Sequence, residues 1–128
     1  MGDPLDVDGE PADGRVDGDD WAFFSGSVTV EDDGYLVVLS DGDLDACDDG
    51  SDPGHYVSFF LQDLNEGERS PYISFLHVEG PLDVSSSASA GPVTVTDVGD
   101  DMIYGSIDHE HDGDNRVQGD FAARICDE

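Results

Sequence analysis

Apolar and polar residues alternate along the last part of the chain, over residues 102–126. Odd-numbered positions on both sides of an acidic segment are mostly apolar or glycine, and the even-numbered positions are mostly polar. A period of two predicts antiparallel strands with one buried face. Odd-numbered residues of the two strands can pair with each other only if the loop between the strands has an odd number of residues. Residues 112–114 (Asp-Gly-Asp) provide a loop of three residues. The pattern therefore predicts a hairpin in which Phe121 covers Gly105 on the opposite strand.

Shorter segments of the same kind precede this hairpin. Turn signals rich in Gly, Pro and Asp separate them, and no helical periodicity is visible. With the hairpin they make seven predicted strands, and the five earlier ones cover residues 21–30, 35–40, 55–61, 71–78 and 93–98. Seven short strands predict an all-β fold, an antiparallel two-sheet sandwich, with a small β-barrel as the alternative. His55 and His77 are interpreted as ordinary strand residues, and residues 41–54 and 79–92 as long loops.

Residues 1–20 differ from the rest of the chain in composition. They are rich in acidic residues and contain little to bury, which is typical of a solvated tether. The alternative is a pair of calcium loops, because Asp6 to Gly9 and Asp13 to Gly18 carry partial Asp-Gly patterns. We expect an acidic N-terminal arm over residues 1–20 and a β-sandwich domain over residues 21–128.

The charge of the chain is strongly one-sided. There are 32 acidic residues against four Arg and no Lys, which gives a formal net charge of −28. Such a charge repels nucleic acid and anionic membranes and attracts cations or basic proteins. It also fits a protein that folds in high salt, a halophilic habit that is compatible with calcium binding.

Two acidic segments are candidate calcium sites, because clustered carboxylate oxygens are the ligands that Ca²⁺ prefers. Neither segment completes the EF-hand pattern, and a run of acidic residues is more often a solvated loop. The candidate ligands are Asp108, Glu110, Asp112, Asp114 and Asp120 in the last hairpin, and Asp41, Asp43, Asp45 and Asp49 in the earlier loop.

His109 and His111 form the one His-x-His pair. Residues two apart in a strand point to the same face, so both imidazoles could bind one transition-metal ion. The structural alternative, a pair of strand-end histidines beside an acidic turn, is the one we favour. In the predicted register His109 lies opposite Val117, and His111 lies opposite Asn115.

Cys47 and Cys126 are the two cysteines of the chain. In an acidic, strand-rich protein they predict a disulfide, with two unpaired buried thiols as the alternative. A disulfide implies an oxidising compartment, so we expect an extracellular or cell-envelope location. Residues 1–20 lack the basic and apolar segments of a secretion signal, so this location implies that Met1 follows a removed signal or a lipidated cysteine. The apolar runs are too short to span a bilayer.

No motif for catalysis is present. The chain has no G-x-S-x-G, no Gly-Lys phosphate loop and no cysteine with a histidine in motif spacing. The serines at 85–87 are interpreted as loop residues. A metal-dependent enzyme or a glycoside enzyme stays an alternative, and the abundance of Asp is no evidence for it.

The closing segment, with Val117, Gly119, Phe121, Ala123 and Cys126, carries a V-x-G-x-F-x-A-x-x-C pattern. With the acidic start and the strand-rich body, it resembles small acidic all-β domains of bacterial secreted proteins and lipoproteins. The resemblance implies an envelope or extracellular location and carries over no catalytic residue.

These observations predict a non-enzymatic binding or structural module, stabilised by Ca²⁺, whose ligand is a protein or a glycan. Self-assembly is a subclass of this function, since an ordered arm could dock on the sheet of a neighbour. An acidic decoy that inhibits a basic protein is the other alternative.

Overall fold

The computed structural model describes residues 11–42, 54–80 and 83–125. These residues form eleven β-strands and no helix, so the prediction of an all-β protein is confirmed. No helix in them is long and apolar enough to cross a membrane. The strands are β1 (Asp13–Val16), β2 (Asp19–Ala22), β3 (Ser25–Glu31), β4 (Gly34–Ser40), β5 (Gly54–Leu61), β6 (Gly67–Arg69), β7 (Tyr72–Gly80), β8 (Asp83–Ala90), β9 (Val93–Val98), β10 (Met102–Asp112) and β11 (Asn115–Ile125).

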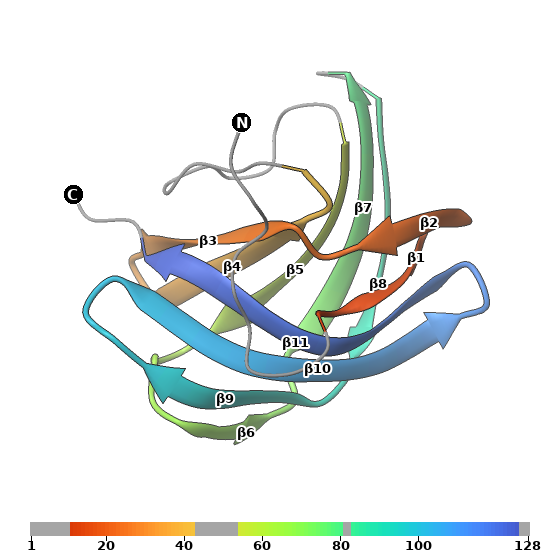
Figure 1. Cartoon of the computed structure of the whole chain (residues 1–128). Helices are drawn as coiled ribbons and strands as arrows, with labels where there is room; N and C mark the ends of the chain where they lie inside the picture. Colours follow the sequence, from red (N-terminus) through yellow and green to blue (C-terminus); the bar gives the residue numbers. More distant parts are fainter. Residues whose placement is uncertain (1–10, 43–53, 81–82, 126–128) are drawn as a thin grey trace.

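All eleven strands belong to one hydrogen-bonded sheet. Its order is β6-β9-β10-β11-β3-β4-β5-β7-β8, and the β1–β2 hairpin is attached to β11. The sheet curls around its own core into an open half-barrel (Figure 1). The predicted two-sheet sandwich of seven strands is not confirmed, because the described strands are more numerous and form a single sheet.

A short parallel pairing joins the two parts of this sheet. β11 and β3 are registered over Arg124 with Ser27 and Ile125 with Val28, whereas all other paired strands are antiparallel. Residues from the two ends of the described chain therefore meet at this junction.

The hairpin of β10 and β11 follows the predicted register over most of its length. Gly105 pairs with Phe121 and His109 pairs with Val117, and the neighbouring β9 places Val95 beside Gly105. The expectation for the turn was wrong. A β-bulge between Glu110 and Asp112 shifts the register, so Asp112, and not His111, pairs with Asn115.

Hydrogen bonds of one carboxylate explain this shorter turn. Asp112 Oδ1 accepts a bond from the backbone N–H of Asp114 at 2.8 Å and one from Asn115 Nδ2 at 3.3 Å. An Asp side chain that binds the backbone two residues ahead stabilises a tight turn. The loop therefore closes with two residues in place of three, and the bulge accommodates the extra one.

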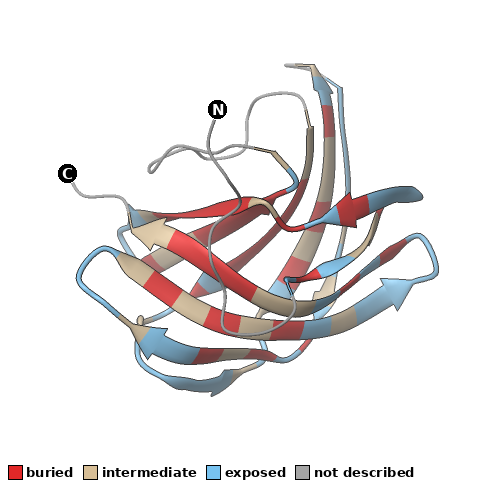
Figure 2. Ribbon diagram, in the orientation of Figure 1, coloured by how far each residue is buried: buried red, intermediate tan, exposed pale blue. Residues whose placement is uncertain are grey.

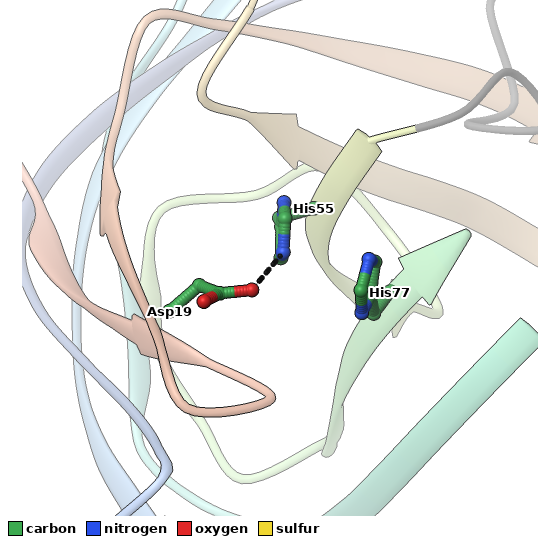
Figure 3. A group of neighbouring side chains, drawn as sticks. All are labelled: Asp19, His55 and His77. Carbon is green, nitrogen blue, oxygen red and sulfur yellow. Dashed lines mark hydrogen bonds and ion pairs between the residues drawn. The ribbon is translucent and has the colours of Figure 1, made fainter. Parts of the chain in front are cut away.

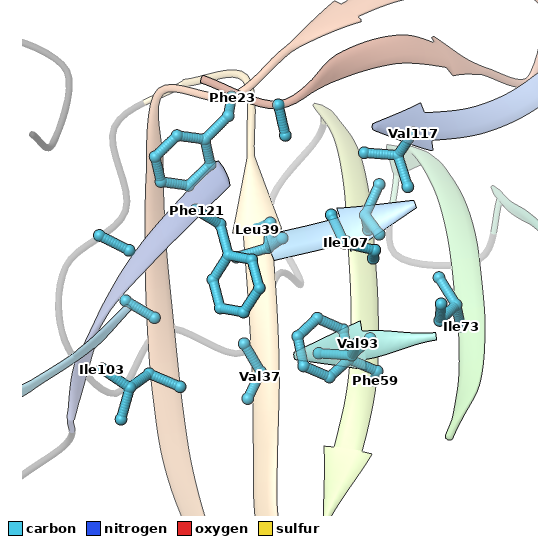
Figure 4. Close-up of a cluster of buried hydrophobic side chains, with 14 of the residues drawn as sticks. Phe23, Val37, Leu39, Phe59, Ile73, Val93, Ile103, Ile107, Val117 and Phe121 are labelled. Atoms are coloured by element: carbon cyan, nitrogen blue, oxygen red, sulfur yellow. The ribbon is translucent and has the colours of Figure 1, made fainter. Parts of the chain in front are cut away.

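The core lies on the concave face of the sheet. Buried positions recur along strands that are far apart in sequence (Figure 2), and their side chains meet there (Figure 4). Phe59 and Phe121 pack edge to face with ring centroids 5.6 Å apart. The largest fully buried side chains are Phe59, Phe75, Phe121, Leu39, Leu61, Ile73, Ile103 and Ile107, with Val16, Val28, Val37 and Val38. A smaller cluster of Val38, Tyr56 and Val78 lies apart from this core.

One expected loop is a strand. Residues 79–92 are rich in Ser, Gly and Pro, yet β8 pairs with β7 from Tyr72–Ala90 to Gly80–Asp83. Most of its side chains are exposed. Its sequence carries no apolar periodicity because neither of its faces is well buried, so the pattern could not reveal it.

Residues 13–22, part of the acidic start of the chain, form the β1–β2 hairpin. Val16 is fully buried and Trp21 is 2% exposed, so two apolar side chains tie the hairpin to the core. Asp17 and Gly18 form its turn with φ angles of 52° and 82°. Positive φ at both central residues is the requirement of a type I′ turn, and Asp-Gly is a sequence that supplies it. This part of the segment expected as a tether is therefore part of the sheet.

Candidate metal centre

Two histidines face each other on adjacent strands. His55 of β5 and His77 of β7 are cross-strand partners, and their rings stack with centroids 4.2 Å apart and planes inclined by 16°. They continue the inward-facing parity of Phe59 and Phe75, at the end of the strands beyond the apolar core.

The turn region of the β1–β2 hairpin brings a carboxylate to each ring. Asp19 Oδ2 lies 2.9 Å from His55 Nε2, and Asp17 Oδ2 lies 2.9 Å from His77 Nδ1. Figure 3 shows Asp19 reaching toward His55 beside the stacked His77. Because a carboxylate only accepts hydrogen bonds, the proton in each contact belongs to the imidazole.

Asp19, His55 and His77 are close enough together to hold one metal ion. One ligand atom from each residue lies within 4.8 Å of the other two, and no second group of this kind occurs in the part of the chain that the structure describes. Tetrahedral Zn²⁺, with bonds of about 2.0–2.1 Å, needs ligand atoms roughly 3.4 Å apart. Asp19 is exposed and both imidazoles are half-buried, so an ion would have to draw the three side chains together and turn the nearly parallel rings toward a common point. Two imidazole nitrogens and one carboxylate oxygen suit Zn²⁺, Ni²⁺, Cu²⁺ or Fe²⁺ better than Ca²⁺.

Asp17 fixes the orientation of His77. His77 Nδ1–H donates this hydrogen bond to Asp17. In the neutral ring Nε2 therefore carries no proton, and its lone pair is available for a metal ion. This bond is also the main cause of the raised pKa of His77; partial desolvation opposes it, and Glu79 adds to it. Glu79 Oε1 lies 3.8 Å from His77 Nε2 and is within reach of the same site.

The hairpin that carries the two carboxylates is itself held in place. The backbone N–H of Asp17 donates to Asn115 Oδ1 at 2.8 Å, and that of Gly18 donates to the carbonyl oxygen of Asp114 at 3.0 Å. Trp21 Nε1 donates to the carbonyl oxygen of His55 at 3.0 Å. The turn of β10–β11 and the start of β5 thus position the hairpin above the histidines.

The candidate calcium ligands of the last hairpin are arranged differently. Asp108 and Glu110 share a shallow hollow with Asp13 and Arg116, and Asp112 binds its own turn. Asp114 and Asp120 do not join them in a group of three oxygen ligands within the described residues. Calcium binding at this hairpin stays a prediction.

Of the earlier acidic loop, only Asp41 lies among the described residues. Desolvation raises the pKa of its carboxyl group, and the His55 imidazole opposes this rise. Asp41 therefore adds negative potential near the histidine pair. The candidate ligands Asp43, Asp45 and Asp49, and the predicted disulfide partners Cys47 and Cys126, lie outside the described residues.

His109 and His111 converge on a hydroxyl group and not on a carboxylate. Ser89 Oγ of β8 lies 2.7 Å from His109 Nε2 and 2.9 Å from His111 Nδ1. His109 also stacks on Phe75, with ring centroids 6.0 Å apart. Desolvation lowers the pKa of His109, and the neighbouring His111 lowers it further. The three residues connect β8 to β10 across the opening of the half-barrel.

Sequence reasoning missed the pairing of His55 with His77, and a signal for it was present. In the segments HYVSFFL and PYISFLHV, each histidine belongs to the same parity as the apolar residues that enter the core. An antiparallel pairing that matches those apolar residues also matches the histidines. The hairpin carboxylates had no comparable signal, because their approach depends on tertiary contacts.

Comparisons with protein-family models, with curated proteins and with solved structures find no match for this chain. The site must therefore be judged on its own geometry.

Proposed function

We propose that this chain is a non-enzymatic binding module in which Asp19, His55 and His77 hold one divalent transition-metal ion. The observation that carries the proposal is the approach of their three ligand atoms to within 4.8 Å. The ligands come from β2, β5 and β7, so a bound ion would cross-link the N-terminal hairpin to the far side of the sheet.

The environment supports a cation at this place. Asp17 and Glu79 lie beside His77, Asp41 lies near His55, and no Arg is among the groups that shift the pKa of His77. Without an ion, a proton lies between His55 Nε2 and Asp19 Oδ2. A bound metal ion would take the place of this proton and contact both atoms. Metal binding would displace that proton, so affinity should rise with pH.

The test is titration of metal-free protein with Zn²⁺ by calorimetry, together with elemental analysis. We expect one Zn²⁺ per chain and a loss of affinity of about tenfold or more in His55→Gln, His77→Gln and Asp19→Asn. Millimolar Ca²⁺ should not compete, because hard oxygen ligands are in the minority here.

His111→Gln is the matched control, since it removes an imidazole outside the site. Unchanged Zn²⁺ binding in the three site variants, or absence of binding in the wild type, would refute the proposal. Loss of binding only in His109→Gln and His111→Gln would move the metal site to the Ser89 cluster.

The wider role follows from the charge and the cysteines. An extracellular or cell-envelope location, and a protein or glycan as the natural ligand, are proposals that rest on the sequence. The acidity of the chain supports a basic partner over an acidic one.

A further inference from the structure

The main path of the sheet, from β6 to β8, ends in two edges that are built differently. β6, at one edge, has three residues and carries the charged side chains of Glu68 and Arg69. β8, at the other edge, has eight residues and pairs only with β7 among the described strands. Short, charged edges resist the addition of another strand, and long, uncharged edges invite it.

β8 has the composition of an accessible edge. From Val84 to Ala90 it carries no charge, no proline and no side chain larger than valine. The five residues from Ser85 to Ser89 are only Ser and Ala, so small side chains leave the backbone open to approach. In a chain of net charge −28, a neutral edge of this length is a departure from the rest of the surface.

One end of this edge strand is tied to neighbouring strands before any partner binds. Ser89 Oγ contacts His109 and His111 on β10, which fixes the end of the strand. Just beyond it, the N–H of Gly91 donates to the carbonyl oxygen of Pro71 at 3.1 Å. A preordered strand loses little conformational entropy when another strand adds to it.

Exposed apolar side chains lie beside this edge. Val84 is 52% exposed and Tyr72 is 73% exposed. Their cross-strand partners are Val78 and Ala90, so both side chains point to the same face of β7 and β8. They offer apolar contacts to the alternate side chains of an added strand, the feature that gives strand addition its specificity.

We propose that the free edge of β8 receives an extended, positively charged segment of another protein as an added strand. The positive charge of the added segment is inferred from the net charge of −28, which attracts a basic segment and repels a second copy of this chain. Backbone hydrogen bonds to residues 83–90 supply the alignment, and the surrounding acidic surface supplies the attraction. This function is independent of the metal site.

The experiment uses a synthetic peptide of alternating valine and threonine with two lysines at each end, added to the ¹⁵N-labelled full chain. The control peptide has the same side chains and charge, but its central amides are N-methylated and cannot donate. NMR chemical shifts and amide hydrogen exchange report the binding position. We expect shifts and slower exchange confined to residues 83–90 and their β7 neighbours with the first peptide only.

Two protein variants make the result specific to β8. Ser86→Lys places a positive charge on the edge strand, and Gln118→Lys adds the same charge on β11. We expect the first variant to weaken peptide binding at least tenfold and the second to weaken it little at 0.15 M salt.

Three results would overturn the proposal. Equal binding of both peptides, with shifts spread over the acidic surface, would show attraction without strand addition. Absence of shifts at residues 83–90 would show that the edge does not accept a strand. Slower exchange at residues 83–90 that grows with protein concentration alone would identify a second copy as the occupant.

Discussion

His55 and His77 stack as cross-strand partners, and each is hydrogen-bonded to a different carboxylate of the same hairpin. Asp19 holds the first ring and Asp17 holds the second. Protonation of His77, or a metal ion bound between the two rings, therefore changes how tightly β1–β2 is held against β5 and β7.

Asp17→Asn should change Zn²⁺ binding in a way that depends on pH. Asp17 raises the pKa of His77, so in the wild type protons compete with the metal ion for this imidazole up to a higher pH. The variant should bind Zn²⁺ about 10–100-fold more weakly at high pH, because the ring loses the partner that orients it. The pH below which proton competition begins to weaken its Zn²⁺ affinity should be lower than in the wild type. Calorimetric titrations across the pH range test this, and an onset at the same pH in both proteins would contradict it.

His77 and His109 should give opposite contributions to the stability of the metal-free protein. The folded-state pKa of His77 is raised, so its contribution is complete below the unfolded pKa of about 6.5 and is lost as pH rises through the raised value. The folded-state pKa of His109 is lowered, so stability is lost as pH falls from about 6.5 through the lowered value.

Urea unfolding across this pH range, with a chelator present, separates the two groups. His77→Gln should remove the stability that the protein gains at acid pH, and His109→Gln should remove the stability that it loses there. Identical pH profiles in wild type and both variants would refute the assignment.

Gly105→Ala should destabilise the fold by about 1–3 kcal/mol. A Cβ at this position would lie 2.3 Å from the carbonyl oxygen of Thr94 and 2.8 Å from the Phe121 ring. The backbone atom cannot move without disturbing the pairing of β9 and β10. Gly113→Ala is the control, because a Cβ at that position would meet nothing within 4 Å and should change stability by less than about 0.5 kcal/mol. Chemical denaturation measures both.

Salt should stabilise the protein more than it stabilises a neutral β-protein. At a net charge of −28, repulsion between carboxylates opposes the folded state, and ions screen it. The melting temperature should rise from low ionic strength to molar KCl. A larger effect of CaCl₂ than of KCl at equal ionic strength would indicate specific calcium sites, and a flat profile in both salts would contradict the calcium and the halophilic interpretations.

Cys47 and Cys126 should be found joined in the purified protein. The chain between them is long, so the disulfide should contribute on the order of 4–5 kcal/mol by constraining the unfolded state. Mass spectrometry after alkylation under denaturing, non-reducing conditions reports it directly. Two alkylated thiols would remove the main argument for an oxidising compartment.

The sequence predicted the parts of the fold in which one strand face is buried and the other is exposed. The register of Gly105 with Phe121 follows from parity together with the position of the acidic turn, because a slip of one residue would expose every apolar side chain. The turn at Asp112 was predicted one residue too long, since a side-chain hydrogen bond decided it and parity did not.

The segments that the pattern missed owe their structure to partners elsewhere in the chain. β8 is mostly exposed and becomes a strand through the backbone of β7. The candidate metal centre was missed for a similar reason. It combines a strand pairing of His55 and His77, which parity could have suggested, with the carboxylate of Asp19, whose position depends on a hairpin docked across the sheet.

The pairing of Asp13 with Gln118 joins β1, the first described strand, to β11, the last described strand. Contacts so distant in sequence form late, because the chain between them must first be ordered. The hairpin that carries Asp17 and Asp19 is also fixed by Asp114 and Asn115. A chain emerging from the ribosome would therefore have both histidines long before it could complete their coordination. A metal ion bound at the candidate centre would therefore indicate a molecule in which β11 has been synthesised and has paired with β1.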